Sequence, residues 1–168
     1  MTRSDLVPDY IKVNFRERSK GVGYFTSNFT INRNVDVVRD QSAIVVHQSI
    51  ICPYYYAAAV VYDMSQIISV LNVMLYDIDS GLVGYSTSFK PIQSCYESIT
   101  IWKDVDSIRS FFTGGIHFSL MEKWKDFFKI GDHILTTRFK ILLGQLPQDQ
   151  KSTLRFWAKV KNLEFNLL

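Results

Sequence analysis

The chain has 168 residues, of which 47% are apolar, so it is long enough to bury the core of one domain, and its composition argues against disorder. Its 19 basic and 16 acidic residues leave a net charge of +3, too small a surplus to indicate nucleic-acid binding. Two cysteines, Cys52 and Cys95, form neither a disulfide framework nor a metal pair. We therefore expect a reducing, cytoplasmic location and no metal.

Residues 1–41 are predicted to form an N-terminal extension, most simply a β-hairpin. Two runs, DYIKVNF (9–15) and VGYFTSNFTI (22–31), are rich in β-branched and aromatic residues, and the charged segment RERSKG lies between them. The segment has no apolar core like that of a secretory signal.

A strand followed by a helix is predicted next. The strand is SAIVVHQSII (42–51), whose Ile and Val content suits a central position in a sheet. Between Tyr54 and Asp79 apolar residues recur every three or four positions, which indicates a helix, and Gly81 follows where a helix commonly ends. Residues 41–62 carry no formal charge, but Pro53 and several polar residues argue against a continuous membrane span.

Two further strands are predicted at LVGYSTSF (82–89) and YESITIW (96–102). Alternation along the second strand places Trp102 on the face that carries the hydroxyls of Tyr96, Ser98 and Thr100. A tryptophan on a hydroxyl-bearing face suits a polar-lined pocket.

The remaining segment predicts two short helices, a strand and a terminal helix. Asp104 or Asp106 can cap the first helix, and Gly114-Gly115 separates it from the second. HILTTRFKILL (133–143) reads as the last strand of the main domain, 42–143. Residues 144–168 then contain a basic helix over 148–165, with Leu154, Trp157, Val160 and Lys161 along one side.

The order strand, helix, strand, strand, helix, strand predicts an α+β, ferredoxin-like fold with a four-stranded antiparallel sheet and two helices on one face. GLVGYSTSFK (81–90), YESITIWKDVDSIRSFFTGGIHFSLMEKW (96–124) and the closing strand TTRFKI (136–141) resemble the antibiotic-biosynthesis-monooxygenase-like superfamily of dimeric α+β barrels. The resembling elements are Ser80-Gly81 to Gly84-Tyr85, Trp102-Lys103-Asp104, Ile108 to Phe111, and Gly115-Ile116-His117 to Met121. The resemblance covers about residues 42–141.

This resemblance implies a homodimer in which two sheets close against each other, because two helices leave one sheet face uncovered. It also implies a cavity between sheet and helices that holds a flat apolar or aromatic molecule. In the family, the tryptophan that matches Trp102 often lines this cavity. Some relatives bind haem through a histidine, and the matching position here falls on or near Met121. Because this chain does not have a histidine at that position, we expect no cofactor.

Candidate site residues follow from this resemblance and from their chemistry. His117 could act as a base, because a neutral imidazole accepts a proton from a phenolic substrate, or it could be a scaffold residue beside the double glycine. Trp102 could be a cavity wall or a core anchor. The candidate substrate-binding residues are Tyr85, Tyr96, Thr100, Phe111 and Met121.

We predict a cofactor-independent, monooxygenase-like protein that acts on an aromatic or polyene-like substrate. The alternative from another class is a non-enzymatic dimeric ligand-binding or interaction module, whose cavity is filled by its own aromatic side chains. A third and weaker hypothesis places the basic terminal helix on an anionic membrane surface, and we expect no such contact. The substrate and the role of residues 1–40 do not follow from the sequence.

Overall fold

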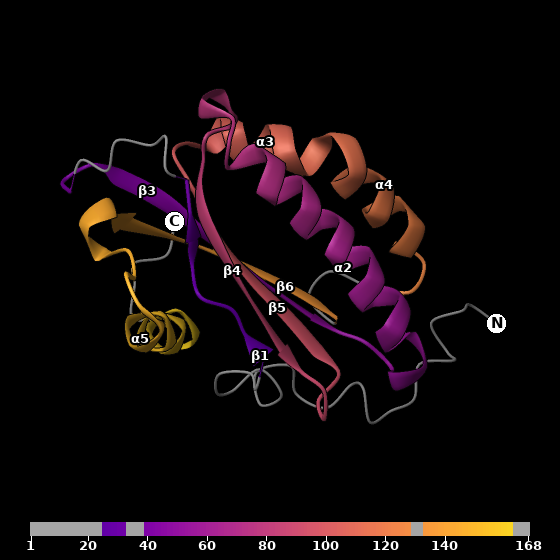
Figure 1. Cartoon of the computed structure of the whole chain (residues 1–168). Helices are drawn as coiled ribbons and strands as arrows, with labels where there is room; N and C mark the ends of the chain where they lie inside the picture. Colours follow the sequence, from indigo (N-terminus) through magenta and orange to yellow (C-terminus); the bar gives the residue numbers. More distant parts are fainter. Residues whose placement is uncertain (1–24, 33–38, 129–132, 163–168) are drawn as a thin grey trace.

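The computed structural model of the chain describes residues 25–32, 39–128 and 133–162. Figure 1 shows a twisted antiparallel sheet with helices on both faces. Helices α2 (Tyr54–Met74), α3 (Val105–Thr113) and α4 (Gly115–Trp124) lie on one face, and α5 (Gln150–Lys161) lies on the other. The helix break predicted at the double glycine is confirmed, with Asp104 capping α3 by accepting from the Ser107 backbone N–H at 2.8 Å.

Four long strands form the centre of the sheet in the order β4-β5-β3-β6. Their bounds are Ser42–Ile51 (β3), Leu82–Lys90 (β4), Cys95–Trp102 (β5) and Ile134–Leu142 (β6). All three neighbouring pairs are antiparallel. Numbered along the chain, the strand order is 2-3-1-4, so the predicted ferredoxin-like α+β fold is confirmed.

The sheet is larger than the predicted four strands. Two short strands, β1 (Phe25–Thr26) and β2 (Thr30–Ile31), each pair with β4, bringing the total to six. Within the described residues these strands extend the sheet edge instead of pairing with each other. The first half of the predicted hairpin, 9–15, lies outside the described residues.

The helical stripe predicted from Tyr54 to Asp79 ends sooner than expected. Helix α2 stops at Met74, and a short 3-10 helix, η3 (Ile78–Ser80), follows it. Gly81 ends η3 with a positive φ of 70°, and a Cβ there would lie 2.0 Å from the Ser107 side-chain oxygen. The glycine therefore allows the turn after α2 to pack closely on α3. A second 3-10 helix, η4 (Leu143–Gln145), follows β6.

Two hydrophobic clusters fill the space between the sheet and helices α2 to α4. One surrounds Trp102 and includes Ile44, Leu71, Leu75, Leu82 and Ile108. The other surrounds Tyr96 and includes Ile50, Val60, Met64 and Phe128. Asp63, on α2, is 1% exposed and accepts from Lys123 Nζ and Trp124 Nε1, each at 2.7 Å. This buried carboxylate ties α2 to α4.

Helix α5 covers the opposite sheet face, which was expected to be open for a second copy. Trp157 and Val160 are fully buried there with Phe156, and Trp157 Nε1 donates to Ser86 Oγ at 2.9 Å. The expectation that this face is uncovered is therefore wrong. Of the residues predicted along one side of this helix, Trp157 and Val160 are buried but Leu154 is 39% exposed, and Phe156 is buried as well.

Helix α2 is long and apolar enough to cross a membrane by length and composition, with 17% of its most apolar window buried. Core helices of soluble proteins can meet the same criterion. The uncharged stretch 41–62, considered above as a span, is divided between β3 and the start of α2.

Candidate functional site

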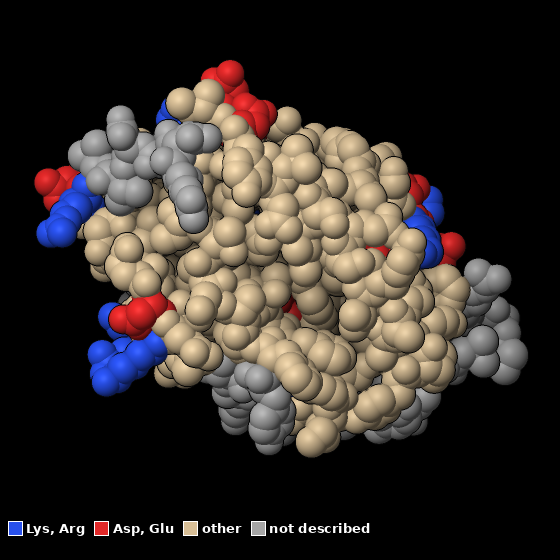
Figure 2. All heavy atoms as spheres, viewed as in Figure 1, with Lys and Arg blue, Asp and Glu red and all other residues tan. Residues whose placement is uncertain are grey.

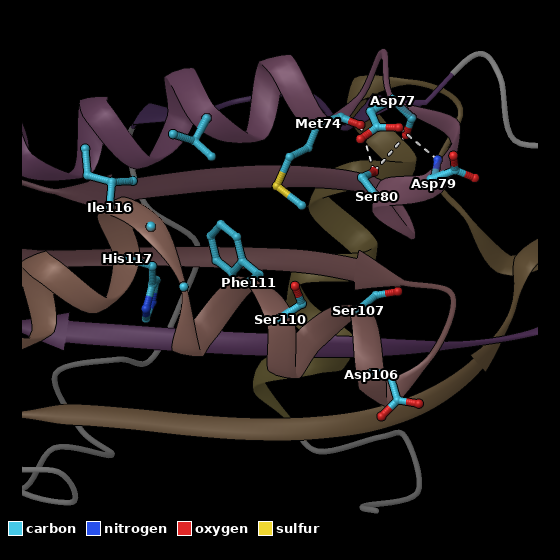
Figure 3. Close-up of a pocket in the computed structure, with 13 residues that line it drawn as sticks. Met74, Asp77, Asp79, Ser80, Asp106, Ser107, Ser110, Phe111, Ile116 and His117 are labelled. Carbon is cyan, nitrogen blue, oxygen red and sulfur yellow. Dashed lines mark hydrogen bonds between the residues drawn. The ribbon is translucent and has the colours of Figure 1, made fainter.

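A groove with a volume of about 640 Å³ lies between the C-terminal part of α2, η3, α3 and the start of α4 (Figure 3). This volume lies within the usual range of small-molecule sites. One end is polar, with Asp77, Asp79 and Asp106. Ile116 and His117 lie toward the other end, with Phe111 between the two ends (Figure 3). The groove therefore suits a ligand with one polar and one apolar end.

The charge of the groove restricts the ligand further. Its lining includes three carboxylates and three serines, Ser80, Ser107 and Ser110, and no described Lys or Arg contributes to it. The three carboxylates are exposed to solvent and Asp106 pairs with Arg109 at 3.3 Å, so the like-charge repulsion of an anionic ligand is small but unfavourable. A neutral ligand, or one that donates hydrogen bonds at the acidic end, fits best.

His117 stands at the apolar end on the first turn of α4. Its side chain is buried, with ring centroids 5.1 Å from Phe111 and 4.4 Å from Phe112. Burial lowers the pKa of the imidazole below its usual 6.5, and a hydrogen bond with the Phe112 backbone opposes that shift in part. The pKa shift keeps the ring neutral at pH 7. Its Nδ1 atom is buried and has no hydrogen-bond partner among the described residues.

His117 also lines a second cavity, in the interior between the sheet and helices α2 and α4. This cavity has a volume of about 30 Å³, and Ile67, Met121 and Trp124 share its lining. Such a space is sufficient for about one water molecule. The imidazole therefore stands between an open groove and a nearly filled interior.

The predicted site residues separate into two groups. His117, Phe111 and Met121 line one or both of these cavities. Trp102, Thr100, Tyr85 and Tyr96 line neither. Trp102 is fully buried, and its indole N–H donates to Thr100 Oγ1 at 2.7 Å. Its ring centroid lies 5.2 Å from that of Phe111, which lines the groove.

Both tyrosines are polar members of the packed interior. Tyr85 donates its hydroxyl to Asn72 Oδ1 at 2.6 Å, and burial raises its pKa. Burial also raises the pKa of Tyr96, although a hydrogen bond with Thr87 opposes the shift. Both hydroxyls therefore stay protonated near neutral pH and act as hydrogen-bonding groups of the core.

A buried charge cluster on the α5 face was missed in the sequence. Glu97 is fully buried and binds Lys161 Nζ at 2.6 and 2.7 Å, with Ser49 donating to it at 2.9 Å. Lys90 and His47 approach the same carboxylate at 3.6 and 3.5 Å. Burial alone would raise the pKa of Glu97, but His47 and Lys161 lower it to about 2. One feature of the sequence does indicate this cluster. Glu97 is spaced by two residues from Ile99 and by four from Ile101, which places the glutamate on the same strand face as these two apolar residues.

Within the described ranges, no group of three His, Cys, Asp or Glu side chains could hold a metal ion. Sequence comparisons add no assignment, because no protein-family model matches and no curated protein matches. Structural comparisons do find similar folds.

A protein of unknown function from Nitrosomonas europaea aligns with a TM-score of 0.50 and 14% identity, covering 66% of this chain and 99% of that protein. A protein from Fusobacterium nucleatum that carries a provisional monooxygenase designation aligns with a TM-score of 0.49 and 10% identity, covering 70% of this chain but only 48% of that protein. A variant of SnoaB, a cofactor-independent oxygenase from Streptomyces nogalater, gives a TM-score of 0.42 and 10% identity over 65% of this chain and 99% of that one.

At these identities the likeness concerns the fold alone. The ferredoxin-like α+β fold that the sequence predicted is confirmed by the strand order and by the likeness to the protein from Nitrosomonas europaea. A shared fold does not transfer a reaction.

Proposed function

We propose that the protein is a cofactor-independent oxygenase-like enzyme that binds a neutral aromatic molecule in the groove and uses His117 as its base. The observation that carries this proposal is a buried imidazole at the apolar end of the groove, with a lowered pKa and an unpaired Nδ1. A base that stays neutral near pH 7 is ready to accept a proton. A cytoplasmic location stays a prediction.

The reaction needs a substrate with an acidic C–H bond, such as the CH₂ group of anthrone. His117 accepts one proton, and the resulting carbanion transfers an electron to O₂. Recombination of the two radicals forms a C–O bond, and the peroxide takes up the proton. Loss of water then gives the ketone, so that one substrate and one O₂ yield one quinone and one H₂O. Here the protein supplies orientation, exclusion of water and the route for the proton.

The groove suits this chemistry because its polar and apolar ends are separate (Figure 3). Phe111 and Ile116 can contact the rings of the substrate near the imidazole. Ser107 and Ser110 can donate hydrogen bonds to the anthrone carbonyl, which shares the negative charge of the deprotonated substrate. The fused-ring substrate would thus lie along the groove with its acidic carbon toward His117.

The second candidate is a binding module without catalysis. It is favoured by the filled interior. There the indole N–H of Trp102 donates to the Thr100 hydroxyl, and the interior cavity has a volume of only about 30 Å³. In this case the ligand binds in the groove and no oxygen is consumed.

The test is oxygen uptake with anthrone, after subtraction of the uncatalysed rate. We expect His117→Gln to lower kcat by about 100-fold or more, the usual contribution of a general base. Leu154→Gln, at an exposed position on α5, is the matched control and should keep the wild-type rate. Equal rates in wild type and His117→Gln contradict the assigned base.

A second variant tests the groove if His117→Gln fails to fold. Ser110→Leu fills part of the groove from α3 without altering the imidazole, so we expect KM to rise with little change in kcat. Binding of anthrone without any oxygen uptake by the wild type would favour the binding module.

A further inference from the structure

Gln48 is a polar residue on an apolar face of the central strand β3. Its neighbours on that face are Val46 and Ile50, which belong to the two hydrophobic clusters beneath helices α2 to α4. Every other residue of β3 after Ser42 is buried, whereas Gln48 is half-buried. A leucine at this position would fill the same space without a polar group to satisfy. The amide therefore indicates a hydrogen-bonding role.

Gln48 and His117 meet at the interior cavity of about 30 Å³, which both side chains line. The rest of the lining is apolar apart from the indole of Trp124, whose N–H donates to Asp63. His117 is 4% exposed, and its Nδ1 atom has no hydrogen-bond partner among the described residues. A cavity of this size holds about one water molecule, and a buried water needs at least two polar partners.

We propose that the interior cavity is a binding site for one water molecule, which bonds the Gln48 amide and the His117 imidazole and thereby holds the imidazole in place. The amide carries both a donor and an acceptor, so it can bond the water in either orientation. A protonated imidazole has an N–H on each nitrogen, and the water can accept from the one that faces the cavity. The other nitrogen is left for the substrate proton.

Gln48 is then a positioning residue for the base. This role rests on the proposed function, whereas the water site itself does not. An imidazole that takes up a proton in a buried place needs an acceptor for its second N–H, because an unsatisfied charged donor is costly there. Gln48 acts through the water and does not contact the substrate.

A row of polar side chains connects the cavity with solvent. Ser98 of β5 and Thr136 of β6 lie directly opposite Gln48, so the three side chains share one face of the sheet. Ser98 is half-buried, and Thr136 is exposed on β6, which lies at the edge of the sheet. Water can reach Gln48 along this row without crossing the apolar clusters.

The charges around the cavity leave the imidazole open to the influence of position 48. Within the described part of the chain, no charged side chain lines the cavity. On the surrounding helices, Asp63 of α2 pairs with Lys123 of α4, and Asp106 of α3 pairs with Arg109. Figure 2 shows charged side chains at the rim of the molecule, with the surface over α2 almost free of them. A charge introduced at position 48 therefore has no competitor inside the cavity.

Two substitutions at this position test the water by their opposite effects on the pKa of His117, measured by ¹⁵N NMR without ligand. Gln48→Leu has a similar volume and should lower that pKa by about one unit, because the protonated ring loses its acceptor. Gln48→Glu should raise the pKa, because a carboxylate stabilises the imidazolium. Thr136→Val, on the same sheet face but outside the cavity, is the control and should leave the pKa unchanged.

A crystal structure provides the second measurement. The wild type should show one ordered water within hydrogen-bond distance of the Gln48 amide and of a His117 ring nitrogen, and Gln48→Leu should show none. A wild-type cavity without that water, or a His117 pKa that is the same in the wild type, Gln48→Leu and Gln48→Glu, overturns the proposal.

Kinetics separate this inference from the proposed function. We expect Gln48→Leu to lower kcat for anthrone on the order of 10-fold with KM unchanged, because the base is weakened and less firmly held. A bound water and the predicted pKa shifts, in a protein that takes up no oxygen, would support the water site and remove the proposed function. Oxygen uptake that His117→Gln abolishes and Gln48→Leu leaves unchanged would overturn the positioning role alone.

Discussion

Trp102 and Thr100 show how a correct strand pattern led to an incomplete picture of the site. Alternation along β5 correctly places Trp102 on the same face as the hydroxyl groups. That placement suggested a polar pocket, but the Thr100 hydroxyl satisfies the indole N–H at 2.7 Å and both side chains are buried. Which hydroxyl pairs with which ring depends on side-chain packing, and the sequence pattern does not encode it.

Trp102→Phe tests whether this tryptophan acts in the core or at the site. We expect the free energy of unfolding to fall by about 1–3 kcal/mol, because the change removes buried volume and leaves Thr100 without its donor. The KM for anthrone should change little, since Trp102 lines neither cavity. Chemical denaturation and steady-state kinetics measure the two quantities. An intact stability with a greatly raised KM would place Trp102 at the site.

His117 presents the opposite case, because a residue singled out for its chemistry lies at a cavity. The motif Gly115-Ile116-His117 to Met121 falls on α4, with His117 in its first turn. The groove itself could not be predicted, since it is bounded by η3, a short helix that the sequence pattern merged with α2. Gly81 enables this geometry through its close approach to Ser107.

Helices and strands were predicted correctly where the apolar residues repeat with one clear spacing along the segment. The four long strands and the break at Gly114-Gly115 follow from alternation, β-branched residues and glycine. The place of α5 did not follow. A helix with one apolar side can bury that side on any apolar surface, and only the tertiary contacts show that Phe156 and Trp157 pack on the sheet.

The charge cluster around Glu97 attaches α5 to that sheet. Lys161→Met should lower the free energy of unfolding by about 3 kcal/mol, because the Glu97 carboxylate loses its closest cation while it stays buried. Adding Glu97→Gln to that variant should recover part of the loss. A double-mutant cycle measured by denaturation checks both values, and strictly additive effects would contradict direct coupling.

The same cluster sets the acid stability of the fold. The pKa of Glu97 is about 2 in the folded protein against 4.5 for an ordinary glutamate, so its contribution is present above pH 4.5. That contribution, about 3 kcal/mol, is lost as the pH falls from 4.5 toward 2, because the unfolded state binds the proton first. Glu97→Gln should not show this part of the pH dependence.

The described residues form a ferredoxin-like sheet with helices on both faces (Figure 1). The open groove lies among the helices of one side. This arrangement changes where contacts with other molecules can occur. The α5 face is occupied by the chain itself, whereas the groove on the other side of the sheet is open to solvent.

The central claim is that His117 is a neutral base within reach of a bound ligand. The most direct measurement is a ¹⁵N NMR titration of the imidazole between about pH 4 and pH 8, with and without anthrone. We predict a pKa below 6.5 in the free protein and a shift of the His117 nitrogen signals on addition of anthrone, absent in Ser110→Leu. A pKa at or above 6.5, with nitrogen signals that anthrone leaves unchanged, would contradict the account.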